Sequence, residues 1–150
     1  MQVMNKTVKM KIIIGADHAG YELKEYIKSQ FSDGFEWQDA GTFGSESVDY
    51  PDYAHPVAEA VSENKVEKGI LICGTGNGVA MTANKHRDVR AALCWNEEIA
   101  KLARQHNDAN ILVLPARFIS KELAAEIVKC FFTTEFECGR HARRIGKINL

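Results

Sequence analysis

The stretch GILICGTGNGVAMTANK, residues 69 to 85, carries an apolar run, a glycine-rich turn and a helical pattern in direct succession. Gly69–Cys73 is a continuous apolar run, which is typical of a strand buried on both faces. The glycines that begin at Gly74 predict a tight turn, because glycine accepts backbone angles that other residues avoid. A helix is expected from about Asn77. This order indicates an α/β fold, with Cys73 at the last apolar position before the turn.

Other apolar runs alternate with helical patterns along the chain, which is typical of βαβ units and a parallel sheet. The predicted strands are Met10–Gly15, Phe35–Asp39, Gly69–Cys73, Val89–Trp95 and Asn110–Leu114. The residues expected on buried helix faces are Leu23, Tyr26, Ile27, Phe31, Tyr53, Val57, Ala60, Val61, Ile99, Leu102, Ala103, Leu123, Ile127, Val128 and Phe131, the last helix following Ser120. With right-handed crossovers, these elements predict a doubly wound, Rossmann-like three-layer sandwich around a five-stranded parallel sheet.

Length and charge narrow the kinds of partner. The chain has 150 residues, 45% of them hydrophobic and 26% charged, which fits one globular domain. We expect a single domain over residues 1–150, with residues 1–9 as a polar leader. The 19 basic and 20 acidic residues leave a formal net charge of -1. This balance argues against nucleic acid or an anionic membrane as a partner and favours a small molecule.

Cysteine usage and the N-terminal segment indicate the compartment. Cys73, Cys94, Cys130 and Cys138 stand far apart and form no C-x-x-C pair, which argues against a zinc site or a disulfide framework. The segment MQVMNKTVKMKIIIG has too few apolar residues for a signal peptide or a membrane-spanning helix. We therefore expect a cytoplasmic protein.

Polar residues follow three of the predicted strands, at the end of the sheet where doubly wound folds bind ligands. Asp17 and His18 follow the first strand, the turn from Cys73 follows the third, and Asn96 and Glu97 follow the fourth. Backbone N–H groups of the glycine turn, with the helix start after it, predict an anion site. The same field would favour the thiolate of Cys73, which could then act as a base or nucleophile. The alternative is an inert buried cysteine.

Familiar glycine motifs do not fit this turn. A P-loop needs Gly-Lys followed by Ser or Thr, whereas the turn leads into Val79 and Ala80. The dinucleotide fingerprint G-x-G-x-x-G follows a first strand, whereas this G-x-G-x-G follows the third. No arginine stands in the residues GTGNGV after Cys73 to make the thiol a phosphatase nucleophile. Nucleotide hydrolysis therefore loses support.

Basic residues near the C-terminus suggest a phosphate site. Arg140 and Arg144 stand four apart, so on a helix both guanidinium groups can point the same way and hold a phosphate. The alternative is a solvated helix face. His106 ends the fourth predicted helix and could be a helix C-cap. Arg117 lies just past the last predicted strand and could be a surface charge or an anion ligand.

Six segments are distinctive together: IIIGADHAGYELK, DAGTF, VDYPDYAHPVA, GILICGTGNGVAMTANK, RQHNDANIL and GRHARRI. They closely resemble the ribose-5-phosphate isomerase B family, sugar-phosphate isomerases of the RpiB/LacAB type, over nearly the whole chain. The resemblance implies an aldose–ketose isomerase of the pentose phosphate pathway that interconverts ribose 5-phosphate and ribulose 5-phosphate through an enediolate. It implies no cofactor and no metal. It also implies a homodimer, or a tetramer, whose site is completed across the subunit interface.

The resemblance assigns roles to single residues. It implies that Cys73 is the base, that Thr75 assists proton transfer between substrate oxygens, and that His106 opens the sugar ring. Asp17 is counted with these catalytic residues and contacts the sugar. The remaining implied substrate-binding residues are His18, Tyr50, Gly74, Gly76, Asn77, Gly78, Asn107, Arg117, Arg140 and Arg144.

Three other functions stay open at this point. A hexose 6-phosphate such as allose 6-phosphate could be the substrate, because the sequence does not give the depth of the pocket. A non-catalytic sugar-phosphate-binding module would keep Arg140 and Arg144 but would not need Cys73, Thr75 and His106 together. A cysteine-dependent redox enzyme or transferase would favour a second thiol near Cys73, and none is close in sequence.

Overall fold

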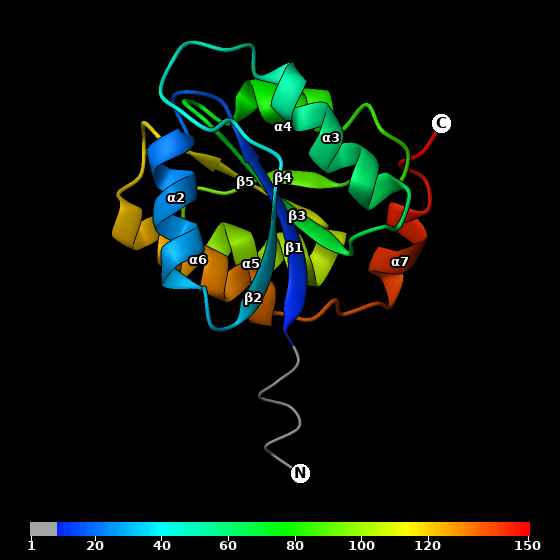
Figure 1. Ribbon diagram of the computed structural model, residues 1–150. Helices are drawn as coiled ribbons and strands as arrows, with labels where there is room; N and C mark the ends of the chain where they lie inside the picture. Colours follow the sequence, from blue (N-terminus) through cyan, green and yellow to red (C-terminus); the bar gives the residue numbers. More distant parts are fainter. Residues whose placement is uncertain (1–8) are drawn as a thin grey trace.

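The computed structural model describes residues 9–150, so all but the last residue of the expected leader lies outside the described part (Figure 1). Five strands form one sheet in the order β2-β1-β3-β5-β4, and every neighbouring pair is parallel. The strands are β1 (Met10–Ala16), β2 (Phe35–Asp39), β3 (Lys68–Cys73), β4 (Ala91–Leu93) and β5 (Ile111–Pro115). The predicted five-stranded parallel sheet is confirmed.

Helices cover both faces of the sheet. The helices are α2 (Tyr21–Gln30), α3 (Pro51–Ser62), α4 (Asn77–Ala83), α5 (Glu97–Asn107), α6 (Lys121–Thr133) and α7 (Arg140–Ile145). Helices α3 and α4 pack on one face, whereas α2, α5 and α6 pack on the other (Figure 1). The strand order explains this division. The connections from β1 to β2, through α2, and from β4 to β5, through α5, run in one direction across the sheet. The connections from β2 to β3, through α3, and from β3 to β4, through α4, run in the opposite direction. Right-handed crossovers therefore place the two sets on opposite faces, and the three-layer sandwich is confirmed.

Alternate residues of each central strand enter the two cores. Ile12 and Ile14 of β1 belong to the core beneath α2, α5 and α6, and Ile13 belongs to the core beneath α3 and α4. Each of the three is at most 2% exposed. In β3, Ile72 and Leu71 divide in the same way, as the two-residue period of a strand requires. This burial on both faces explains why the strands read as continuous apolar runs.

The predicted boundaries fail mainly at β4. The other four strands match their predicted ends within a residue, but the seven-residue run Val89–Trp95 yields a strand of three residues. Asp88 has a positive φ of 65, and the Arg90 N–H donates to the side-chain oxygen of Asn110 instead of entering a regular ladder. As the outermost strand, β4 also pairs only with β5 among the described strands. The regular strand is therefore limited to Ala91–Leu93, although the apolar run predicted a longer one.

The chain changes direction across the sheet between β1 and β3. It leaves β1 toward β2 and leaves β3 toward β4, so the connections after these neighbouring strands diverge. The Asp17 N–H donates to the Ile72 carbonyl at 3.3 Å, which ties the two strand ends together. A crevice at such a divergence is where open α/β sheets bind ligands. Among residues 9–150, no helix has both the length and the apolar character to cross a membrane.

Candidate active site

Cys73 ends β3 and points into the glycine turn. Its side chain is 5% exposed, and its sulfur accepts a hydrogen bond from the Gly76 N–H at 3.2 Å. Gly76 has a φ of 79, in the left-handed region, and a Cβ there would collide with Leu93. Only glycine is therefore suited to bring this N–H to the sulfur. The turn delivers a backbone donor to the Cys73 thiol and carries no side chain of its own at Gly74, Gly76 and Gly78.

Thr75 and Asn77 form the outer rim of the same turn. Both residues are exposed, and the Asn77 N–H donates to the Thr75 hydroxyl oxygen at 3.2 Å. This bond fixes the Thr75 hydroxyl close to the first residue of α4. The hydroxyl keeps its own proton available to a substrate oxygen.

Two side chains predicted to bind substrate lie against glycines of the turn. A Cβ on Gly74 would stand 3.1 Å from Nη1 of Arg117, and a Cβ on Gly78 would stand 2.6 Å from Cε1 of Tyr50. Because Gly74 and Gly78 have no side chains, the Arg117 guanidinium group and the Tyr50 ring can pack directly against the turn. The structure brings Tyr50 and Arg117 to the Cys73 turn from distant points in the sequence.

Asp17 and His18 stand beside the turn, at the end of β1. One carboxylate oxygen of Asp17 accepts the N–H groups of Ala19 and Gly20, at 3.0 and 3.2 Å, and the side chain is 7% exposed. Nδ1 of His18 accepts the Val48 N–H at 3.1 Å, so a neutral ring carries its proton on Nε2. Asp17 thus shapes the loop with one oxygen, and His18 offers a donor to a ligand.

The remaining predicted residues form a second group. His106 and Asn107 end α5, and Arg140 and Arg144 belong to α7, which packs against α5. His106, Asn107 and Arg144 line a hollow of about 400 Å³. Both arginines are exposed. The second group has the charge and the space to receive an anion.

Within one chain the two groups lie at opposite ends of the sheet. Cys73 pairs in register with Pro115 at the carboxyl end of β5, whereas His106 precedes Ile111 at the amino end of β5. Four residue steps between Ile111 and Pro115 span roughly 13 Å. The structure therefore gathers Cys73, Thr75, Asp17, His18, Tyr50 and Arg117 at one end, and His106, Asn107, Arg140 and Arg144 at the other.

Sequence reasoning missed two residues that contact His106. The ring of His141 stacks on that of His106 with centroids 4.3 Å apart, and a carboxylate oxygen of Glu137 lies 3.9 Å from Nε2 of each ring. Burial, followed by the charges of His106 and Arg140, lowers the pKa of His141 below its usual value. No local motif joins these three residues, because α7 must first fold onto the end of α5.

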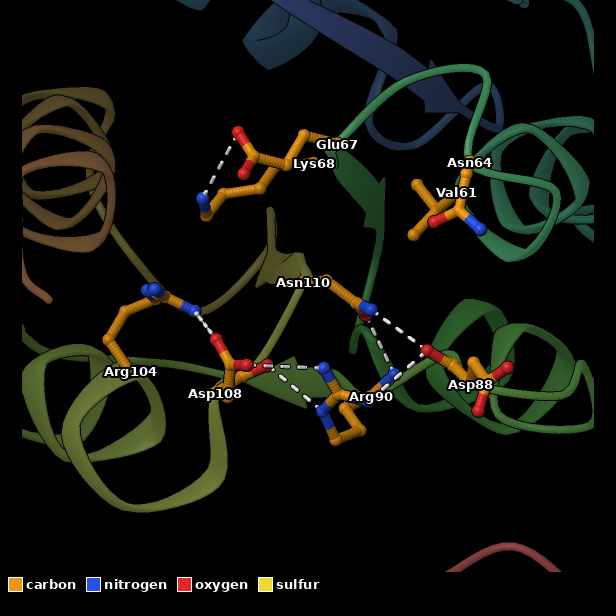
Figure 2. A pocket seen from close by; sticks show the side chains of 9 residues that line it. All are labelled: Val61, Asn64, Glu67, Lys68, Asp88, Arg90, Arg104, Asp108 and Asn110. Atoms are coloured by element: carbon orange, nitrogen blue, oxygen red, sulfur yellow. Dashed lines mark hydrogen bonds and ion pairs between the residues drawn. The ribbon is translucent and has the colours of Figure 1, made fainter. Parts of the chain in front are cut away.

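A separate hollow of about 300 Å³ lies at the amino end of the sheet, and Figure 2 shows the side chains that line it. Its charges are mostly paired: Arg104 donates to Asp108 at 2.8 Å, and Arg90 lies 3.5 Å from the same carboxylate. Arg104 is 5% exposed and also donates to the carbonyls of Ala109 and Thr134. These contacts fix the end of α5, next to His106, and the paired charges indicate a structural role.

Comparison with known proteins places the chain in a family. The Ribose/Galactose Isomerase family model matches residues 12–148. The chain is 49% identical to "Putative sugar phosphate isomerase YwlF" of Bacillus subtilis, over 93% of this chain and 95% of that protein. It is 45% identical to "Ribose-5-phosphate isomerase B" of Escherichia coli, over 92% and 93% of the two chains.

Solved structures agree with these sequence matches. The ribose 5-phosphate isomerase of Thermotoga maritima superposes with a TM-score of 0.91 at 52% identity, covering 93% of this chain and 97% of that one. The Mycoplasma genitalium ribose-5-phosphate isomerase B, solved with bound ribulose-5-phosphate, gives a TM-score of 0.88 at 45% identity and 93% coverage of each chain. The sheet, the turn after β3 and these matches agree, and the chain belongs to the Ribose/Galactose Isomerase family.

Proposed function

We propose that the chain is an aldose–ketose isomerase that interconverts ribose 5-phosphate and ribulose 5-phosphate, with Cys73 as the base. The observation that carries the proposal is the Cys73 sulfur, buried at the end of β3 and held by the Gly76 N–H at 3.2 Å. A backbone donor on the sulfur stabilises a thiolate, the form that can take a proton. The solved relative with bound ribulose-5-phosphate supports the choice of sugar.

The chemistry needs one base and several hydrogen-bond donors. The Cys73 thiolate takes the proton from C2 of the open-chain aldose, and the C2–H electrons form the C1=C2 bond of an enediolate, with the negative charge on O1. Backbone N–H groups from Gly74 to Gly78 stabilise this charge. Thr75 relays the proton from O2 to O1, and Cys73 returns its proton to C1 as O2 becomes the ketose carbonyl. Every proton and electron pair remains on the substrate at the end.

The second group of residues supplies the other steps. His106 protonates the ring oxygen of the cyclic sugar and opens the ring, and Arg140 and Arg144 bind the phosphate. From the Cys73 group, Asp17, His18 and Tyr50 contact the sugar, and Arg117 joins Asn107 of the second group around the substrate and its phosphate. Because roughly 13 Å of β5 separates the two groups in one chain, we propose that a second copy contributes one of them. The working enzyme is therefore a homodimer, or a tetramer built from two such dimers.

A coupled assay of the purified chain without added metal tests the substrate. Ribose 5-phosphate should be turned over with a higher kcat/KM than allose 6-phosphate or galactose 6-phosphate. Preference for allose 6-phosphate would replace the pentose with a hexose phosphate. Binding of ribose 5-phosphate without any turnover would leave a sugar-phosphate-binding module and remove the isomerase.

A further inference from the structure

We propose that His106, Glu137 and His141 form a binding site for Zn²⁺ or a similar borderline transition-metal ion, and that the bound ion inhibits the enzyme. One ring nitrogen of each histidine and a carboxylate oxygen of Glu137 lie within 4.8 Å of one another, and Nε2 of both rings faces the same Glu137 oxygen. The inhibition rests on the proposed function, whereas the binding of the ion does not.

The two histidine–carboxylate distances are close to the spacing of ligands in a zinc site. Each histidine nitrogen lies 3.9 Å from the same oxygen of Glu137. Ligands around a tetrahedral zinc with bonds of about 2.1 Å stand roughly 3.4 Å apart. The two rings are stacked with an interplanar angle of 13°, so their in-plane lone pairs are nearly parallel, and the His106 ring must turn for both nitrogens to reach one ion. Glu137 is 50% exposed on its side chain and His106 is 41% exposed, so both side chains have room to move. His141 is 9% exposed and supplies the fixed ligand.

The backbone holds these residues together from two elements. The Glu137 N–H donates to the Gln105 carbonyl at 3.1 Å, which fixes Glu137 beside the last turn of α5. The His141 N–H donates to the Cys138 carbonyl at 3.2 Å, which fixes His141 in the first turn of α7. Arg104 fixes the same end of α5 through Asp108 and Thr134. The site is thus part of the folded framework at the junction of α5 and α7.

The ligand types select the metal. Two imidazoles and one carboxylate are ligands that zinc and its neighbours accept, and they leave a fourth position for water. His106 and His141 both line the hollow of about 400 Å³, which gives that position access to solvent. Arg140 and Arg144 lie close to His141 and disfavour ions held by charge alone. Mg²⁺ and Ca²⁺, which prefer oxygen ligands, should therefore bind poorly.

The consequence for catalysis follows from the lone pair of His106. A metal ion on Nε2 occupies the nitrogen that would carry a proton to the ring oxygen, so the metal-bound form cannot open the cyclic sugar. Zn²⁺ should therefore inhibit turnover of cyclic ribose 5-phosphate, and a chelator should restore it. The metal is not needed for the reaction itself.

Isothermal titration calorimetry of the full chain with ZnCl₂, in a phosphate-free buffer, tests the site directly. We expect one saturable Zn²⁺ per chain and no comparable heat with MgCl₂. Glu137→Gln removes an exposed ligand and should weaken binding by roughly 10–100-fold or more. His141→Gln should do the same, and circular dichroism of both variants checks that they fold.

His86→Gln is the matched control, because His86 also faces a second histidine, His55, with ring nitrogens 2.7 Å apart. The His86→Gln variant should bind Zn²⁺ at the proposed site with the same affinity as the native chain. Co²⁺ serves as a spectroscopic probe: ligation by histidine and carboxylate gives no sulfur-to-metal band. Absence of saturable Zn²⁺ binding, native affinity in Glu137→Gln, or a cobalt spectrum with sulfur ligation would each overturn the site, whatever the substrate proves to be.

Discussion

Cys73 owes its position to the backbone around it more than to any charged neighbour. The strand buries the sulfur, and the left-handed turn at Gly76 brings an N–H to it at 3.2 Å. The sequence predicted the buried strand, the glycine turn and the convergence of its N–H groups, but not which N–H contacts the sulfur. By contrast, Tyr50 and Arg117 lie against Gly78 and Gly74 through tertiary contacts that no local pattern reports.

Replacement of the Cys73 sulfur tests its role as the base. Cys73→Ser is nearly isosteric and keeps the turn, but a hydroxyl is far too weak a base at neutral pH. We expect turnover of ribose 5-phosphate to be abolished while circular dichroism and substrate binding by calorimetry stay close to native. Near-native turnover in this variant would remove Cys73 from the reaction.

His106 should act only on the cyclic sugar. His106→Asn removes the proton donor for the ring oxygen, so turnover of cyclic ribose 5-phosphate should fall more than turnover of an acyclic analogue that needs no ring opening. Steady-state rates on both substrates with the same enzyme preparation provide the measurement. Equal losses on the two substrates would contradict the assignment to ring opening.

At the scale of elements, α7 presents its arginines from a short helix packed on the end of α5. Its sequence predicted two arginines on one face, and Arg140 and Arg144 stand one turn apart in α7. It did not predict His141 as a buried partner of His106, because that contact depends on how the two helices meet. The length of edge strand β4 was overestimated for a related reason. An apolar run indicates burial, but it does not indicate how many neighbouring strands are available for pairing.

Phosphate binding by α7 can be tested with a control on the same helix. Arg140→Ala and Arg144→Ala should each raise KM for ribose 5-phosphate, since a lost charged hydrogen bond costs roughly 1.5–3 kcal/mol. The Lys variants should lie between, because they keep the charge but lose the planar fork. Arg143, also exposed on α7, should tolerate Ala with little change in KM. If Arg143→Ala and Arg144→Ala behave alike, the phosphate is held elsewhere.

A buried ion pair joins α2 to β2. Lys24 is 0% exposed and lies 2.7 Å from Asp39, which Lys28 also contacts at 2.7 Å. Burial raises the pKa of Asp39, but the hydrogen bonds from Lys24, Lys28 and the Gly41 N–H outweigh it and leave the pKa below its usual value. The pair thus stabilises the fold at pH values above the ordinary pKa of aspartate, about 3.9.

This pair predicts an acid-sensitive contribution to stability. As the pH falls from neutral through the lowered pKa of Asp39, its stabilisation should be lost. Asp39→Asn should destabilise the chain by about 3 kcal/mol at pH 7, because it leaves Lys24 buried with a weaker partner. The difference from native should shrink toward pH 3 in urea unfolding. Glu25 also contacts Lys24, at 2.8 Å, but its side chain is 44% exposed, so Glu25→Gln should cost less than about 1 kcal/mol.

At the scale of the whole molecule, the sheet sets the distance between the two groups of site residues. Parallel strands put every β–α turn at one end and every α–β turn at the other, so a residue that ends α5 lies away from a residue that ends β3. The resemblance to the family had implied a site shared between subunits. The fold gives that expectation a physical reason, because the two groups in one chain face opposite ends of β5.

Complementation between two damaged chains tests whether the site is shared. In a twofold dimer that takes Cys73 from one copy and His106 from the other, a heterodimer of Cys73→Ser and His106→Asn has one doubly damaged site and one native site. Random exchange of equal amounts makes half of the dimers mixed, so turnover of cyclic ribose 5-phosphate should recover to about a quarter of native. Either variant exchanged with itself should recover nothing, which controls for refolding. If the mixture stays at the average of the two variants while mass spectrometry of the intact complex shows mixed dimers, each chain builds its site alone, and His106 has no part in the chemistry at Cys73.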